Sequence, residues 1–397
     1  MSLLLKNARL IDWRGVLAEN GHVLVRDGKI SHIETGDTAP GSDVARVIDC
    51  GGLTLLPGFI NGHVHLSMDS SVHPMNRLAS QDSHAALLCA ARNAREMLSA
   101  GFTTVRDCGG KSNEVLCLRD FISAGQMEGP RIIGCGQAIL ATGGHFTGRV
   151  ADGPCDVRKA AREMVHMGAD FIKVMATGGL GRPGEMPGAQ EMFLDELTES
   201  ARVAHAQNRR VAAHCHGAEG IADSLRAGID SIEHGTFLSQ TAAEMMAERG
   251  VFLVPTFAAY SIISDRGTDA GLAPYLVEPA RQVLDAKMSR FAYALSAGVK
   301  IAYGTDAGSP LNPHTDVLTE AKQMQDAGMS SVDIVAALTV RCAELFGVET
   351  SVGCLMPGKE ADLVLVEGNP LKDLTSLARV RMVLKHGKIA KNPVKEA

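Results

Sequence analysis

Short apolar runs alternate with amphipathic stretches through most of the chain. Eight of these runs have the composition of strands, and they cover residues 56–66, 102–108, 131–140, 171–176, 210–214, 231–234, 251–257 and 299–304. Helical patterns lie between them, at 83–100, 157–167, 194–207, 218–227 and 241–249. Several end at a glycine, as at Gly228 and Gly250, because glycine enters the left-handed conformation that closes a helix at little cost. Eight strand–helix units in succession predict an α/β protein with a (β/α)8 TIM barrel.

The two ends of the chain have a different pattern of apolar and polar residues. Residues 3–10, 22–26 and 29–34 form short alternating pieces, and 361–367 and 380–385 repeat this pattern near the C-terminus. Asp27-Gly28 and His386-Gly387 have the composition of tight hairpin turns. Neither end is long enough to fold alone, so we predict that 1–55 and 355–397 form one composite antiparallel β-sandwich domain beside a barrel of residues 56–354.

Composition and charge narrow the class of protein. With 45% hydrophobic and 21% charged residues, the 397-residue chain has the material for a large core. The formal net charge of −6 gives no broad basic field, which argues against a nucleic-acid partner. No apolar run approaches the roughly 20 residues that span a bilayer, and the N-terminus lacks a signal-peptide pattern, so we expect a cytoplasmic protein with no membrane partner.

The nine cysteines are scattered and include no Cys-x-x-Cys pair, which favours reduced thiols over disulfides or a thiolate zinc site. Barrels of this kind often oligomerise, and a homo-oligomer stays an open alternative.

Titratable residues stand at or near the ends of the apolar runs. His63 and His65 have one residue between them, so on an extended backbone both imidazoles face the same side and can reach one metal ion. Catalytic groups of such barrels gather at the C-terminal ends of the strands. The other candidates there are Lys173, His214, His234 and Asp306.

Each candidate also has an ordinary structural explanation. A single histidine at a strand end is more often a hydrogen-bonded structural residue than a ligand. Lys173 could extend its amine to solvent or form a buried ion pair, and Asp306 could cap the following helix. Their joint position at the strand ends of one barrel nevertheless favours a common site. Cys215 alternates with His214 and is expected to point away from it.

These motifs, in this order and on these strands, resemble those of the amidohydrolase superfamily over nearly the whole chain. The likeness is greatest to the branch of imidazolonepropionase-like proteins, Xaa-Pro dipeptidases (prolidases) and N-acyl amino acid hydrolases. The matching segments are Thr142-Gly-Gly-His145, Lys173-Val-Met-Ala-Thr-Gly-Gly, the step from His214 to His234, and Gly304-Thr-Asp306.

The resemblance implies a centre of two divalent metal ions. In the resembling enzymes the lysine of the fourth strand is carboxylated by carbon dioxide and bridges both metals. One metal would then be held by His63, His65, Lys173 and Asp306, and the other by N6-carboxylated Lys173, His214 and His234. Nitrogen and oxygen ligands without thiolates suit zinc first, with manganese, cobalt or iron as alternatives.

The same resemblance implies a mechanism. A metal-bridging hydroxide would attack an amide carbon, with Asp306 as general base and then general acid. His145 would donate a hydrogen bond to the developing oxyanion, unless it is a loop histidine satisfied by the backbone. His216 is expected to face the substrate, where a tyrosine often stands in the resembling dipeptidases. The 178–190 loop borders the site, and Arg182 within it could bind an anionic group.

We therefore expect an enzyme, a metal-dependent amidohydrolase acting on carbon–nitrogen bonds of a small-molecule amide. The leading substrates are a dipeptide of the Xaa-Pro type or an N-acyl amino acid. The alternative is a cyclic amide, urea or carbamate hydrolase, although single-metal ring-opening relatives usually lack a bridging lysine such as Lys173. A third reading is a non-catalytic scaffold on the same fold, which the filled ligand positions oppose.

Overall fold

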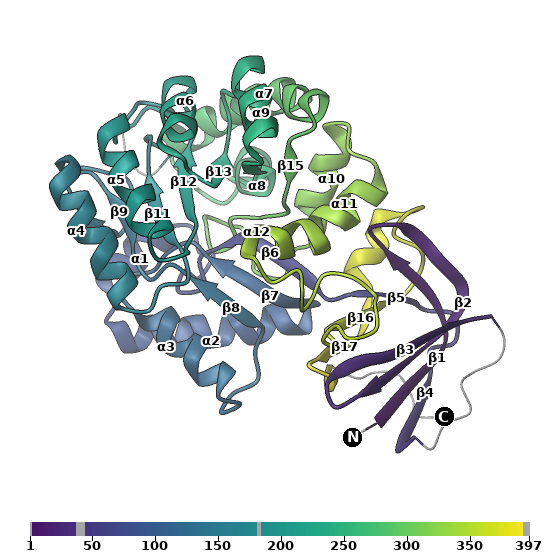
Figure 1. The fold of residues 1–397 in the computed structure, drawn as a ribbon. Coiled ribbons are helices and arrows are strands. Elements are labelled where there is room, and N and C mark those ends of the chain that lie inside the picture. Colours follow the sequence, from purple (N-terminus) through teal and green to yellow (C-terminus); the bar gives the residue numbers. More distant parts are fainter. Residues whose placement is uncertain (1, 37–43, 181–183, 392–397) are drawn as a thin grey trace.

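The strands and helices of the central region alternate in the predicted order (Figure 1). The computed structural model describes residues 2–36, 44–180 and 184–391. Two parallel sheets carry the central strands. The first pairs β6 (Phe59–Val64), β7 (Phe102–Asp107) and β8 (Arg131–Gly134). The second has the order β10 (Gly148–Val150), β9 (Ala138–Leu140), β11 (Ile172–Met175), β12 (Val211–Cys215), β13 (Ser231–His234), β14 (Phe252–Val254) and β15 (Lys300–Ile301).

Helices cover the outside of these sheets (Figure 1). They are α1 (Pro74–Ser80), α2 (Ser83–Ser99), α3 (Glu114–Ser123), α4 (Gly153–His166), α5 (Leu194–His205), α6 (Ala218–Ala227), α7 (Gln240–Arg249), α8 (Phe257–Arg266), α9 (Pro274–Ala297), α10 (Leu318–Asp326), α11 (Ser331–Ala336) and α12 (Cys342–Phe346), with a π-helical turn at Ala337–Arg341. Gly228 and Gly250 end α6 and α7 with φ of 89° and 69°, as predicted. The fold is a TIM-barrel-like α/β fold.

Two of the predicted strands are broken. The first divides at Pro57-Gly58, and its first part, β5 (Thr54–Pro57), pairs in the terminal sheet instead. The third divides because Gly136 turns the chain with φ of 72° between β8 and β9. Individual hydrogen bonds join the eighth segment to the first: Gly62 N–H donates to Tyr303 O (2.7 Å), and Asp306 N–H donates to His63 O (2.8 Å). Within the described residues, the central strands therefore form two separate sheets and no single closed one.

Segments from both ends of the chain build a third sheet, seen as adjacent purple and yellow strands in Figure 1. Its order is β18 (Lys388–Lys391), β17 (Val380–Lys385), β16 (Leu363–Val366), β5, β1 (Ser2–Asp12), β2 (Gly15–Arg26) and β3 (Lys29–Thr35), while β4 (Arg46–Asp49) pairs with β1. Asp27-Gly28 and His386-Gly387 are the predicted hairpin turns, and all four residues have positive φ. The prediction of a purely antiparallel arrangement is wrong, because β4 and β5 both run parallel to β1.

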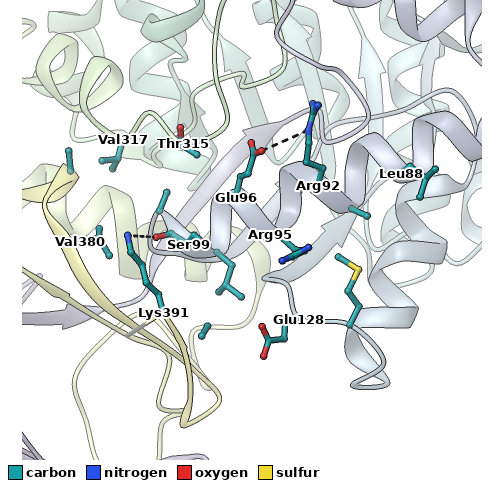
Figure 2. Close-up of a pocket in the computed structure, with 16 residues that line it drawn as sticks. Leu88, Arg92, Arg95, Glu96, Ser99, Glu128, Thr315, Val317, Val380 and Lys391 are labelled. Carbon is teal, nitrogen blue, oxygen red and sulfur yellow. Dashed lines mark hydrogen bonds and ion pairs between the residues drawn. The ribbon is translucent and has the colours of Figure 1, made fainter. Parts of the chain in front are cut away.

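A surface hollow of about 1090 Å³ lies between α2 and the C-terminal strands (Figure 2). Its charged side chains have both signs, and Lys391 Nζ donates to Ser99 O across its edge (3.1 Å). None of the predicted site residues lines it. Among the helices of the described residues, none has the length and apolar character needed to cross a membrane.

Candidate metal centre

The predicted strand-end residues meet in one pocket. It is lined by His63, His65, Lys173, His214, His234 and Asp306, together with His145. Parallel strands explain this convergence. β6, β11, β12 and β13 all end at the same rim, and the segment after β15 adds Asp306 to it. Residues that lie more than 200 positions apart in the chain thus share one site.

Hydrogen bonds fix three of these imidazoles from behind. His63 Nδ1 bonds to Glu233 Oε2 (2.7 Å), His65 Nδ1 to Gly109 O (2.9 Å) and His234 Nδ1 to Thr256 Oγ1 (2.6 Å). The carboxylate and the carbonyl can only accept, and the Thr256 hydroxyl donates its own hydrogen to Pro255 O (2.7 Å). Each Nδ1 therefore carries a ring hydrogen, which turns each Nε2 towards the pocket, where it can bind a ligand once it carries no hydrogen, as in metal sites.

Two polar atoms of the pocket have no hydrogen-bond partner within the part of the chain that the structure describes: Lys173 Nζ and His214 Nε2. Lys173 is 1% exposed, so its amine does not extend to solvent, and no ion pair with a described residue neutralises it. A buried ammonium in this state is costly, whereas buried polar groups are normally bonded. The two atoms thus fit a bound group that would complete their bonding.

Asp306 stands beside two histidines, with Oδ1 3.3 Å from His65 Nε2 and 3.6 Å from His63 Nε2. Burial disfavours its charged form, but the bond to His65 and the nearby cationic groups hold its pKa below the usual value. Its backbone has φ of 58°, an uncommon conformation for a non-glycine residue that is typical of functional sites. Asp306 precedes no helix directly, because α10 begins at Leu318, and helix capping is thereby excluded.

A buried ion pair behind the pocket was not predicted from the sequence. Arg106 Nη2 donates to Glu233 Oε1 (2.6 Å), and its Nε donates to Gly62 O (2.6 Å). Burial opposes ionisation of Glu233, but the Arg106 charge and the bond to His63 hold its pKa far below the usual value. The signal in the sequence that could have indicated this pair is a charged residue inside each of two apolar strands. The pair keeps Glu233 ionised, so that it orients His63.

His145 lies at the edge of the pocket, with its ring centroid 4.5 Å from that of His214. Its Nδ1 is 3.1 Å from Glu185 Oε1, and the same oxygen accepts a hydrogen bond from Gly179 N–H (2.6 Å). The 178–190 loop therefore borders the site, as expected, while Arg182 lies outside the described residues.

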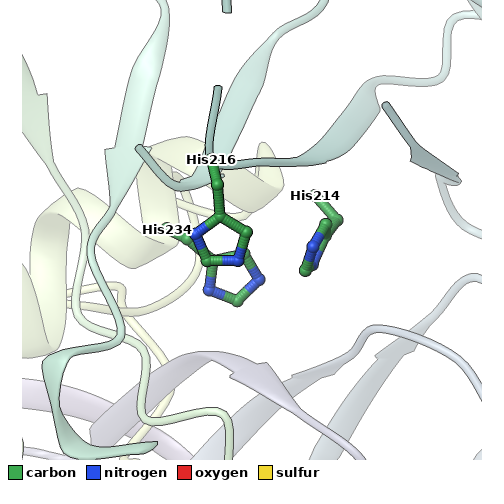
Figure 3. Close-up of side chains that lie close together, drawn as sticks. All are labelled: His214, His216 and His234. Atoms are coloured by element: carbon green, nitrogen blue, oxygen red, sulfur yellow. The ribbon is translucent and has the colours of Figure 1, made fainter. Parts of the chain in front are cut away.

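His216 is fully buried and does not line the pocket. Its ring stacks on that of His234 at 4.8 Å and 9°, while the His214 ring stands edge-on to both, with centroids 4.4 Å from His234 and 4.8 Å from His216 (Figure 3). One ring nitrogen from each of the three histidines lies within 4.8 Å of the other two, but both nitrogens of His216 already bond to Thr236 and Tyr260. Tyr260 itself lines the pocket, so the structure places a tyrosine where His216 was expected to face the substrate.

The remaining walls of the pocket are mostly apolar. They are formed by Met68, Met75, Phe146, Met175, Leu180, Ala259, Ile263 and Pro310, with hydroxyl groups from Tyr260 and Ser309. Cys215 is absent from these walls and packs below α6, as its alternation with His214 predicted. Apart from Lys173, no described residue of the pocket wall is a lysine or an arginine.

The buried imidazoles predict a pH-dependent stability of the metal-free protein. Burial lowers the pKa of His63 to about 4 and places those of His214 and His234 well below the usual value. The unfolded chain takes up protons on these rings below about pH 6.5, whereas the folded chain takes one up on His63 only near pH 4 and keeps His214 and His234 neutral well below pH 6.5. The contribution of these rings to the free energy of unfolding is therefore greatest above pH 6.5. It falls towards pH 4 by about 1.4 kcal/mol for each ring and each pH unit.

Urea unfolding of chelator-treated protein between pH 7.5 and 4.5 checks this. His84→Gln is a suitable control, because the His84 side chain is 95% exposed and its removal should leave the slope unchanged. A stability that stays level over this range would contradict the expectation.

Fold and site together define the class of TIM-barrel-like proteins whose histidine and aspartate side chains at the C-terminal ends of the strands can hold a metal ion. The chain belongs to the amidohydrolase family, whose model matches residues 54–390. This confirms the resemblance read from the motifs. Members of this family are generally metal-dependent. The chain is thus a hydrolytic enzyme that acts on carbon–nitrogen bonds and hydrolyses amides, which excludes the non-catalytic scaffold.

Three relatives illustrate the similarity. Ochratoxinase from Aspergillus niger is 30% identical over 372 residues, which cover 85% of this chain and 76% of ochratoxinase. A solved structure of a Xaa-Pro dipeptidase with bound methionine is 30% identical with a TM-score of 0.89, and 100% of both chains is covered. A prolidase complexed with N-methylphosphonate-L-proline is also 30% identical, with a TM-score of 0.89, over 99% of this chain and 100% of the prolidase.

Proposed function

We propose that the protein is a binuclear metal-dependent hydrolase that cleaves the amide bond of a dipeptide or an N-acyl amino acid. The observation that carries this proposal is the unpartnered amine of Lys173, buried among four histidines and an aspartate. A lysine in such a place is costly unless its charge is removed or compensated. Carboxylation does both, because the neutral amine forms a C–N bond with carbon dioxide, releases one proton and becomes an anionic carbamate.

Carboxylated Lys173 would bridge two metal ions, most suitably zinc given the nitrogen and oxygen donors. One ion would be held by His63, His65 and Asp306, and the other by His214 and His234. Three properties of the chain support these ligands: the Nε2 atoms that the Nδ1 bonds turn towards the pocket, the unpartnered His214 Nε2, and the ionised Asp306. When bound, the two ions supply an activated water and polarise the substrate carbonyl.

The side chains of the pocket then have separate tasks. Asp306 accepts a proton from the attacking water and delivers it to the leaving nitrogen, as general base and then acid. Its position 3.3 Å from His65 Nε2 supports this role, because it places an ionised carboxylate among the metal ligands. His145 donates a hydrogen bond to the developing oxyanion and is held by Glu185.

The similarity to an Xaa-Pro dipeptidase and a prolidase supports amide substrates that contain an amino acid. The methionine, phenylalanine and leucine side chains of the pocket support an apolar group next to the scissile bond. One observation favours the alternative of a cyclic amide, urea or carbamate: the described pocket wall has no cationic group besides Lys173 to pair with a free carboxylate.

A substrate panel on the zinc-reconstituted protein tests this proposal. It should contain N-acyl amino acids and Xaa-Pro dipeptides with apolar or charged side chains, with phenylureas and carbamates alongside. Apolar members should exceed charged ones of similar size in kcat/KM by about tenfold or more, since burying one apolar side chain contributes roughly 1.5–3 kcal/mol. Turnover confined to ureas or carbamates would establish the alternative, and turnover of no panel member would overturn both.

We also propose that residues 1–55 and 355–397 form a β-sandwich domain and 56–354 the barrel, with the end of β5 at Pro57 crossing the first boundary. A separate apolar cluster supports this division, since it joins Leu5, Leu10 and Val23 with Leu365 and Met382. The cytoplasmic location and a homo-oligomeric state stay predictions.

A further inference from the structure

A line of three hydrogen-bonded side chains leads from the protein interior to the pocket. Thr236 Oγ1 is 2.7 Å from His216 Nδ1, and His216 Nε2 is 3.0 Å from the Tyr260 hydroxyl oxygen. Thr236 and His216 are fully buried, and Tyr260 is 5% exposed and lines the pocket. The mechanism above uses none of the three, although the rings of His216 and Tyr260 both contact His234.

The hydrogen-bond partners of Thr236, His216 and Tyr260 determine which atom carries each hydrogen. The buried Thr236 hydroxyl must donate its hydrogen, and His216 Nδ1 is its only bonding partner among the described residues. Nδ1 is therefore the acceptor. Both partners of His216 are neutral hydroxyls, so the ring carries one hydrogen, and it lies on Nε2 and is donated to the Tyr260 oxygen. The Tyr260 hydrogen then has no acceptor in the described protein and is available to the pocket.

The tyrosine ring is held firmly. It stands edge-on to His216, with centroids 5.6 Å apart at 89°, and the ammonium of Lys287 lies 4.5 Å from its centroid on another side. Lys287 is in turn fixed by the Pro255 carbonyl oxygen. A tyrosine hydroxyl is protonated at neutral pH and can therefore donate its hydrogen.

Tyr260 is positioned on the side of the pocket that holds His214 and His234. Its ring centroid is 6.0 Å from that of His234, while the His145 ring centroid is 4.5 Å from that of His214. We propose that Tyr260 is a catalytic residue that donates a hydrogen bond to the carbonyl oxygen of the amide under attack, with His216 and Thr236 as positioning residues that hold its hydrogen towards the substrate. This inference rests on the proposed function, since it assigns a role in amide cleavage at this pocket.

The first test replaces the donor. Tyr260→Phe removes the hydroxyl and keeps the ring, so kcat should fall about 100-fold, the loss typical of one oxyanion donor, with KM within about threefold. Metal content and melting temperature should stay at the values of the unmodified protein. The affinity for a methylphosphonate analogue of the best amide substrate should fall by a similar factor to kcat/KM, because the tetrahedral phosphonyl oxygen takes the place of the oxyanion.

A matched pair tests the positioning residues. Thr236→Val keeps the shape but removes the hydroxyl, so His216 can take the other tautomer and accept the Tyr260 hydrogen, and kcat should fall about tenfold. Thr236→Ser restores a hydroxyl at this position and should recover most of that loss. A purely structural role would instead lower the melting temperature of Thr236→Val and leave kcat of the folded fraction unchanged, which would overturn the relay.

Substrates with and without a free carboxylate separate the remaining outcomes. An equal loss on an N-acyl amino acid and on its carboxamide supports donation to the scissile carbonyl. A loss confined to the carboxylated substrate would mean that Tyr260 binds the carboxylate and would overturn the proposal. Full activity of Tyr260→Phe on amides would overturn it as well, while the proposed function would stand. Absence of amide turnover in the unmodified protein would overturn the proposed function, and with it the role of Tyr260.

Discussion

Asp306→Asn is expected to lower kcat by about 10⁴-fold while the protein keeps both metal ions. Asparagine retains the shape of the side chain and one oxygen that can bind a metal, but it cannot accept and return a proton at neutral pH. General acid–base catalysis by one group contributes roughly 10²–10⁴-fold, and here the same carboxylate serves both proton transfers. The short distance to His65 Nε2 (3.3 Å) shows how closely this carboxylate is held at the proposed ligands.

Steady-state kinetics and metal analysis of the same preparation check this expectation. Asp316→Asn is a control on the same side of the fold, because Asp316 accepts hydrogen bonds from Leu318 and Thr319 at the start of α10 and lies outside the pocket. Its replacement should affect stability and leave the chemistry intact. Substantial turnover by Asp306→Asn with full metal content would contradict the role of Asp306 as general base.

The second large effect is expected from Lys173. Lys173→Met keeps much of the volume of the side chain but removes the amine that is proposed to carry the carbamate. Activity should fall at least 1,000-fold, and metal content should drop from two ions to one or none, because both ions lose an anionic ligand. Inductively coupled plasma mass spectrometry gives the metal content, and kinetic assays give the activity.

Chemical rescue distinguishes a missing ligand from a damaged fold. Lys173→Ala leaves space for a short carboxylic acid, so propionate should restore part of its activity and metal content, whereas Lys173→Met should gain nothing because the space is filled. Reconstitution of the unmodified protein should likewise be slower in buffer free of carbon dioxide. Equal metal content in Lys173→Met and the unmodified protein would exclude a bridging role.

The order of the strands could be predicted from the sequence, because each strand of a parallel sheet is a short apolar run between helical patterns. The breaks could not be predicted in the same way. Residues 56–66 read as one strand, but Pro57 ends β5 in the terminal sheet and β6 begins at Phe59. Residues 131–140 likewise contain Gly136, and only the folded backbone shows that it turns there. Parallel pairing of β1 with β5 required tertiary contacts that no local pattern reports.

The convergence of the pocket residues could also be predicted, because each candidate stands at or near a strand end. His216 shows the limit of that reasoning. Alternation would make it line the pocket with His214, but β12 ends at Cys215, and the His216 ring instead stacks on His234 and bonds to Thr236 and Tyr260. Tyr260 was not predicted, because an aromatic residue in a helix resembles core. The Arg106–Glu233 pair connects two distant strands, which one sequence does not reveal.

The most direct test of the account is the diffraction structure of the zinc-loaded protein, with anomalous data collected at the zinc edge. Two anomalous peaks are predicted in the pocket, one beside His63, His65 and Asp306 and one beside His214 and His234. Extra density on Lys173 Nζ should connect them, as expected for a bridging carbamate. A single peak, or two peaks beside an unmodified lysine amine, would contradict the binuclear centre proposed for this enzyme.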